Sequence, residues 1–101
     1  MIGLTEQQQA TICSVLRRHP AVSRAILFGS RAKATHTERS DIDLALEGIQ
    51  SEGEAEAIRS ELEESNLPQR FDVLAMACIQ HQELREHIQR VGLPIYPKRG
   101  A

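Results

Sequence analysis

Residues 41–47 alternate strictly between polar and apolar side chains, and this alternation constrains the fold more than any other feature of the chain. Ile42, Leu44 and Leu46 fall on one side, whereas Asp41 and Asp43 fall on the other. A period of two is typical of a strand with one buried face. Aspartate is depleted from strands and neighbouring carboxylates repel each other, so the pair needs a compensating partner. We expect a half-buried strand that carries two acids.

A bound cation is one such partner. Side chains two residues apart on a strand share a face and lie roughly 7 Å apart. Mg²⁺ is a hard ion that takes carboxylate and phosphate oxygens. Asp41 and Asp43 are therefore predicted metal ligands. The alternative is a solvated polar face without a metal. Considered without the rest of the chain, Asp41 and Asp43 would favour this alternative.

A candidate phosphate site precedes the acids. The apolar run ends at Gly29, and Ser30 is a residue type that often caps a helix, here expected over about residues 31–34. A strand that runs into a helix start presents free N–H groups to an anion. Gly29 and Ser30 are predicted to hold a nucleotide's phosphates with help from Arg31. The alternative for Arg31 is an ordinary surface charge.

A third acid lies in a later apolar segment. Asp72 is the one acid in the predicted strand RFDVLAM, and a lone acid in such a strand is costly unless it has a partner. If this strand neighbours residues 41–47, Asp72 can ligate the metal or take a proton from an attacking hydroxyl. Its alternatives are to cap an edge or to pair with Arg70. Three carboxylates and a phosphate site fit metal-assisted attack on a nucleotide's α-phosphate.

The remaining pattern predicts an α/β (α+β) fold, with a small mixed sheet of three to four strands backed by helices. Thr5 with Gln8 and Ser51 with Glu54 are typical of helix starts. Further helices are expected from Ser51 to about residue 65 and over residues 79–91. Pro94 and Pro97 would confine a fourth strand to the edge of the sheet. A length of 101 residues suits one domain, 1–101.

Composition excludes several functional classes. A formal net charge of −2 argues against a broad electrostatic nucleic-acid binder. The apolar runs are too short to span a membrane, and the polar N-terminus is unlike a signal peptide. Cys13 and Cys78 lack metal-site spacing and are expected to be buried free thiols. We expect a cytoplasmic protein.

The spacing of these motifs resembles a known family. Gly29-Ser30, ten further residues, Asp41-Ile42-Asp43 and the later Asp72 are similar to the minimal nucleotidyltransferases of the DNA-polymerase-β-like superfamily, and the segments GSRA, SDIDLAL and LREHIQRVGLPIY extend the likeness over nearly the whole chain. The resemblance implies that Gly29 and Ser30 hold the triphosphate of ATP. It also implies that Asp41, Asp43 and Asp72 bind one or two Mg²⁺ ions.

The same resemblance implies a partner. Many members are encoded beside a small helical HEPN-domain toxin and act as antitoxins, transferring AMP from ATP to a tyrosine of that toxin. A competing hypothesis is a non-catalytic antitoxin that neutralises its partner by complex formation. A third hypothesis, modification of a small molecule such as an aminoglycoside, is disfavoured because those enzymes usually carry an added acceptor-binding domain.

Overall fold

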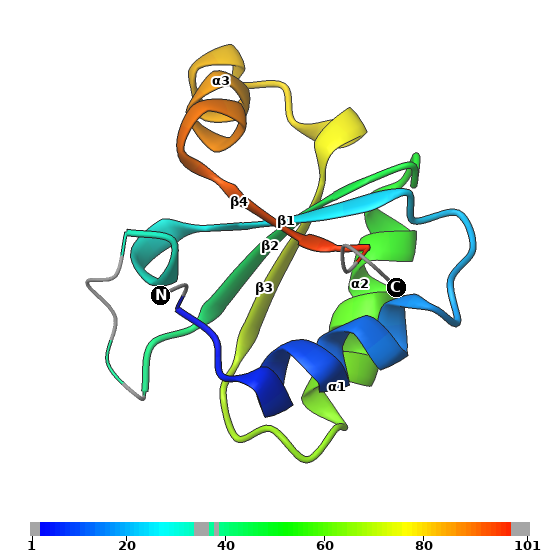
Figure 1. Ribbon diagram of the computed structural model, residues 1–101. Coiled ribbons are helices and arrows are strands. Elements are labelled where there is room, and N and C mark those ends of the chain that lie inside the picture. Colours follow the sequence, from blue (N-terminus) through cyan, green and yellow to red (C-terminus); the bar gives the residue numbers. More distant parts are fainter. Residues whose placement is uncertain (1–2, 34–36, 38, 98–101) are drawn as a thin grey trace.

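The computed structural model describes residues 3–33, 37 and 39–97, which form one four-stranded sheet with helices on both faces (Figure 1). In this part of the chain the elements follow in the order α1 (Glu6–Leu16), β1 (Arg24–Phe28), the 3₁₀ turn η1 (Gly29–Arg31), β2 (Ile42–Glu47), α2 (Glu52–Glu63), β3 (Phe71–Ala75), the 3₁₀ turn η2 (Met76–Cys78), α3 (Gln82–Val91) and β4 (Leu93–Tyr96). The predicted α/β class is confirmed.

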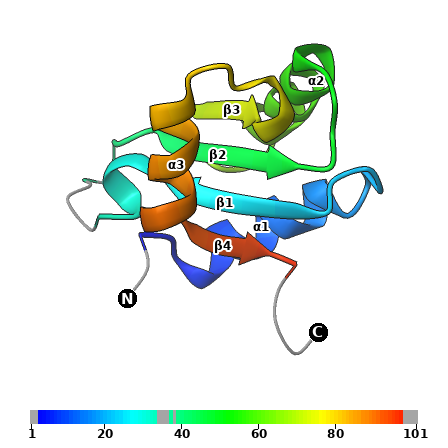
Figure 2. The same ribbon diagram turned by 90° about the horizontal axis from the view of Figure 1, so that it is seen from above.

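The sheet is mixed, with strand order β3-β2-β1-β4 (Figure 2). β1 pairs antiparallel with both β2 and β4, whereas β2 and β3 are parallel. β4 is a genuine strand on the edge, where Pro94 is tolerated because no further strand needs its missing N–H. The parallel pair matters most for function, because it places the acid of β3 beside those of β2.

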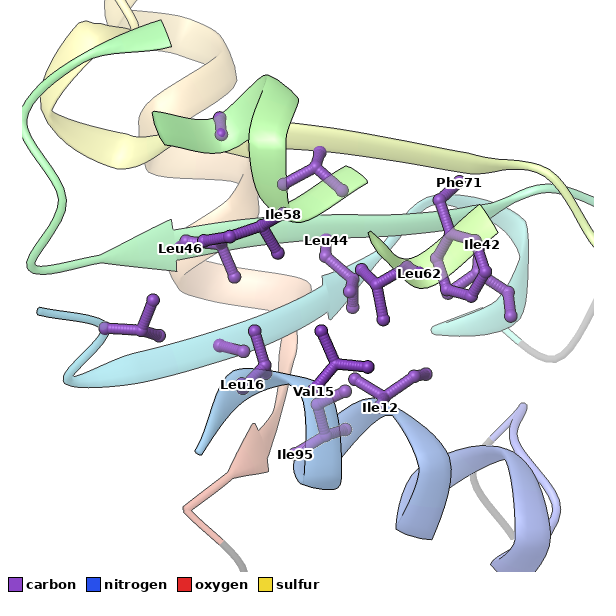
Figure 3. Packing of buried hydrophobic residues seen from close by; sticks show 14 of the residues in the cluster. Ile12, Val15, Leu16, Ile42, Leu44, Leu46, Ile58, Leu62, Phe71 and Ile95 are labelled. Atoms are coloured by element: carbon purple, nitrogen blue, oxygen red, sulfur yellow. The ribbon is translucent and has the colours of Figure 1, made fainter. Parts of the chain in front are cut away.

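The main core lies between the sheet and the helices α1 and α2 (Figure 3). Ile42, Leu44 and Leu46 of β2 are fully buried there, as the alternation predicts. Ile12 and Leu62 pack on them from α1 and α2. Burying each such side chain contributes roughly 1.5–3 kcal/mol, so this face fixes the register of the sheet.

α3 covers part of the other face of the sheet. Ile88 of α3 packs with Ile26 and Ala45 in a smaller cluster. Figure 2 shows α3 crossing the strands near the end of β1, the region in which β2 and β3 begin. The acids of β2 and β3 point to this second face, since they alternate with the residues of the main core.

The helix starts follow the predicted chemistry. Thr5 and Gln8 form a reciprocal capping box, with the Gln8 amide 3.1 Å from Oγ1 of Thr5 and the Thr5 amide 2.9 Å from Oε1 of Gln8. The Ser51 hydroxyl accepts from the Glu54 amide at 3.2 Å. Such caps satisfy backbone N–H groups that have no partner within the helix.

Two predicted local structures are wrong. Ser30 does not cap a helix: it lies inside η1, whose N-cap position is occupied by Phe28. The reason is that Gly29 turns the chain at φ +75° directly after β1, which starts the turn one residue early. The last helix begins at Gln82 rather than 79, because Met76–Cys78 form a separate 3₁₀ turn. The helix predicted after Ser30 was expected to end at about Ala34, which lies outside the described residues.

Two further predictions concern the state of the cysteines and the presence of a membrane-spanning helix. Both cysteines are free, Cys13 buried as expected and Cys78 only partly buried. Among the described residues, no helix has the length and apolar character needed to cross a membrane.

Candidate active site

The parallel pairing of β2 and β3 brings two of the predicted ligands together. Asp43 and Asp72 are direct register partners, and adjacent strands lie about 5 Å apart. Asp43 is half-buried and Asp72 is exposed. Asp41 is exposed and precedes the first residue of β2. The chain contains no aspartate besides these three, so all of its aspartates gather at the start of two neighbouring strands.

The turn that follows β1 contacts the central acid of this group. Phe28 pairs with Asp43 in the antiparallel register, which carries Gly29 up to the Asp43 side chain. A Cβ atom built on Gly29 would lie only 2.2 Å from Oδ2 of Asp43. Glycine at position 29 therefore permits both a positive φ and this close approach. We call η1, residues Gly29–Arg31, the Gly-Ser turn.

The electrostatics of Asp43 are unfavourable for a free carboxylate. Burial, followed by the nearby charges of Asp72 and Asp41, raises the pKa of Asp43 to about 6, against the opposing effect of Arg31. A bound cation would offset these effects, because an adjacent positive charge favours the charged carboxylate. A carboxylate with a raised pKa beside two further acids is therefore a candidate for cation binding.

Arg31 occupies an unexpected position. Its side chain is buried, with 3% of its surface exposed. The guanidinium donates to the carbonyls of Ser40, Gly3 and Thr37, at 3.0, 2.8 and 3.4 Å from its terminal nitrogens. It is therefore not the surface charge of the alternative hypothesis. A contact with phosphate stays a prediction, and the described contacts indicate a structural role developed below.

The described residues contain no group of three or more His, Cys, Asp or Glu side chains placed so that it could hold a metal ion. The three-carboxylate ligand set of Asp41, Asp43 and Asp72 therefore stays a prediction. Mg²⁺ commonly takes one or two carboxylates and completes its shell with water and substrate phosphates. The oxygen donors and the raised pKa of Asp43 fit such an ion. Asp43 with Asp41 or Asp72 would supply the protein's share of the ligands.

An apolar wall borders the acids. Phe28, Leu74 and Leu84 are partly buried and pack against the cluster beneath α3. Phe28 is the register partner of Asp43, and Leu74 follows Asp72 by two residues on the same face. None of these three was predicted as a site residue. For Phe28 and Leu74 the signal is the period of two, since each shares its strand face with a site residue.

The alternative of an Asp72–Arg70 ion pair finds no support. In the part of the chain that the structure describes, the ion pairs are Arg18–Glu61, His19–Glu61, Arg24–Glu47, Arg59–Glu56 and Arg59–Glu63. None of these involves a site acid. Asp72 instead has Asp43 as its nearest described strand partner.

A mixed sheet with paired strand acids beside a glycine turn defines a nucleotidyltransferase-type protein. The chain belongs to the polymerase beta nucleotidyltransferase family, whose domain matches residues 10–100. This assignment confirms the family predicted from the motif spacing. No curated protein sequence matches the chain.

Solved structures share the fold. A chain of a toxin–antitoxin structure with AMP-PNP is 20% identical at a TM-score of 0.76, covering 90% of this chain and 74% of that one. A chain of the MntA–HepT toxin–antitoxin structure is 18% identical at a TM-score of 0.70, covering 91% and 72%. A third, from a complex of tri-AMPylated Shewanella oneidensis HEPN toxin with MNT antitoxin, is 18% identical at 0.71, covering 92% and 72%.

Proposed function

We propose that this chain is a Mg²⁺-dependent nucleotidyltransferase that moves AMP from ATP to a hydroxyl of a partner protein. The observation that carries the proposal is the register pairing of Asp43 with Asp72 beside the Gly-Ser turn. A phosphate chain held at Gly29 and Ser30 would lie next to these acids. Mg²⁺, when bound by the acids, would neutralise the phosphate charge and polarise the α-phosphorus.

The chain's own residues have separate tasks in this reaction. Gly29 and Ser30 position the triphosphate through backbone N–H groups and the hydroxyl, and Asp41 and Asp43 hold the cation. The acceptor oxygen forms a bond to the α-phosphorus, and the bond from that phosphorus to the bridging oxygen breaks to release pyrophosphate. Asp72, exposed on the edge strand, takes the acceptor's proton.

We infer that the acceptor is a HEPN-domain toxin, with a tyrosine as the modified residue, so that the chain acts as an antitoxin. Support comes from the shared fold with antitoxins in toxin–antitoxin structures, one of which contains an AMPylated HEPN toxin. Exposed Asp72 is open to a macromolecular acceptor. A protein acceptor brings its own binding surface, so the reaction does not require a domain that binds a small acceptor.

The test uses a purified HEPN-domain protein, ATP and Mg²⁺, with intact-mass analysis of the toxin and a growth assay in cells that express both chains. The proposal predicts a mass increase equal to one or more AMP groups with wild type and none with Asp43→Asn. Growth rescue that persists with Asp43→Asn would show that complex formation suffices, which is the non-catalytic alternative. An unmodified toxin with wild type would contradict the proposed activity.

A further inference from the structure

Arg31 is the one charged side chain among the described residues that is buried, and the proposed chemistry gives it no task that explains this burial. Removing a guanidinium from water is costly unless its N–H groups are satisfied. Within the described residues, Nε and Nη2 donate to the Ser40 carbonyl at 3.2 and 3.0 Å, Nη2 to the Thr37 carbonyl at 3.4 Å, and Nη1 to the Gly3 carbonyl at 2.8 Å. These three acceptors are all backbone carbonyls.

These carbonyls belong to two segments: Gly3 precedes α1, whereas Thr37 and Ser40 lie in the connection that leads into β2. Ser40 directly precedes Asp41, so the double hydrogen bond fixes the backbone where the metal-binding acids begin. Thr37 lies in the same connection, and its amide donates to the Ser40 hydroxyl oxygen at 2.9 Å. Arg31 itself ends the Gly-Ser turn. One side chain therefore ties the turn to the start of β2.

Gly3 contacts Arg31 from the segment that precedes α1. Besides accepting from Nη1, its backbone lies directly on the turn: a Cβ atom at position 3 would be 2.2 Å from the Arg31 carbonyl oxygen and 2.7 Å from the Arg31 Cα. The next residue, Leu4, is buried in the main core with 7% exposure. The segment before α1 thus anchors the turn to the core.

We propose that Arg31 is a positioning residue: with Gly3, Thr37 and Ser40 it forms a clamp that sets the distance between the Gly-Ser turn and Asp41–Asp43. The expected effect on metal binding rests on the proposed function, whereas the clamp itself is inferred from the hydrogen bonds. Groups that orient metal ligands from outside commonly change metal affinity by roughly 10- to 100-fold when altered.

The test compares Arg31→Lys with Gly3→Ala. Lysine keeps the positive charge beside Asp43, so any effect reports the lost planar fork of donors rather than a changed charge. Gly3→Ala leaves Arg31 intact and pushes the anchoring segment away from the turn. Arg24→Lys is the matched control, because Arg24, the first residue of β1, also makes a two-pronged contact, with Glu47 at 3.1 and 3.0 Å, but is exposed.

Two readouts are taken on each variant: hydrogen exchange of the backbone amides at residues 3–5 and 39–43, and the affinity for Mn²⁺ alone by calorimetry. The clamp predicts faster exchange and Mn²⁺ affinity lowered by roughly 10- to 100-fold in both test variants. The control keeps wild-type exchange and affinity. Unchanged exchange in both test variants would overturn the proposal.

A direct phosphate role gives a different pattern. Arg31→Lys would then weaken binding of AMP-PNP while leaving Mn²⁺ affinity and exchange as in wild type, which also overturns the clamp. If wild type itself binds no Mn²⁺, the metal-dependent part of the proposed function fails. The exchange comparison alone then decides for or against the clamp.

Discussion

Gly29 and Asp43 are in contact, since a Cβ atom on Gly29 would stand 2.2 Å from the Asp43 carboxylate oxygen Oδ2. This contact joins the two halves of the candidate site, the Gly-Ser turn from β1 and the acids from β2. It exists because Phe28 and Asp43 are register partners in the antiparallel pair. The closeness of the proposed phosphate site to the proposed metal ligands is thus a consequence of strand pairing.

Gly29→Ala is expected to disrupt both the turn and the carboxylate. A φ of +75° disfavours any side chain, and such strain costs about 1–3 kcal/mol. We predict a loss of that size in the free energy of unfolding by urea, together with loss of nucleotide transfer. Gly53→Ala is the control, because the nearest atom to a new Cβ there is 3.9 Å away. Equal stability and activity of Gly29→Ala and wild type would refute the contact.

Asp43→Asn is expected to stabilise the metal-free protein at neutral pH. The pKa of Asp43 is raised to about 6 from 3.8, so the folded state holds this proton more tightly than the unfolded state. The resulting stability is present below pH 3.8 and is lost as pH rises to about 6. After allowance for partial exposure, the gain at pH 7.5 is about 1 kcal/mol.

The measurement is urea unfolding of both proteins in a chelating buffer from pH 4 to pH 8. The difference in unfolding free energy should be near zero at the acid end and grow with pH. Glu83→Gln, an exposed carboxylate on α3, controls for a general change in net charge. A destabilised Asp43→Asn at pH 7.5 would show that the carboxylate makes a favourable contact in the absence of metal.

Mg²⁺ with AMP-PNP is expected to raise the melting temperature of wild type, because ligands that bind only the folded state stabilise it. Asp43→Asn should show no such rise. The effect should shrink at pH 5, since protons compete with the cation for Asp43, whose pKa is about 6. Thermal unfolding with and without the ligands measures it. An equal rise in both proteins would place the ligand elsewhere.

Asp72→Asn is expected to separate catalysis from nucleotide binding. If Asp72 takes the acceptor's proton, its loss lowers kcat by roughly 10²- to 10⁴-fold, while the affinity for AMP-PNP changes little because Asp41 and Asp43 remain. Calorimetry and steady-state transfer rates test this on the same preparation. A variant that loses nucleotide affinity with unchanged kcat would instead make Asp72 a ligand without a proton-transfer role.

Much of the architecture could be predicted because its signals are local. The alternation in residues 41–47 determines which face of β2 is buried, and the Thr5–Gln8 pair marks the start of α1. The family likeness rests on the spacing of Gly29-Ser30 and Asp41-Ile42-Asp43. Pairing β2 beside β3 was a condition of the predicted site, and the parallel register fulfils it.

What could not be predicted depends on contacts between distant segments. The burial of Arg31 arises from carbonyls of Gly3, Thr37 and Ser40, and a single arginine carries no pattern that indicates such acceptors. The helix expected after Ser30 is absent from the described residues because the positive φ of Gly29 starts the turn one residue earlier. The residue type of Ser30 suggested a helix cap, but the backbone conformation of Gly29 places Ser30 inside the turn.

The central claim is transfer of a nucleotidyl group, and label transfer from ATP tests it most directly. Cell lysate containing the partner is incubated with Mg²⁺ and ATP labelled at either the α- or the γ-phosphate, using wild type and Asp43→Asn. The proposed activity predicts one protein band labelled from the α-position alone, and absent with Asp43→Asn. Label arriving from the γ-position would show phosphoryl transfer and contradict nucleotidyl transfer.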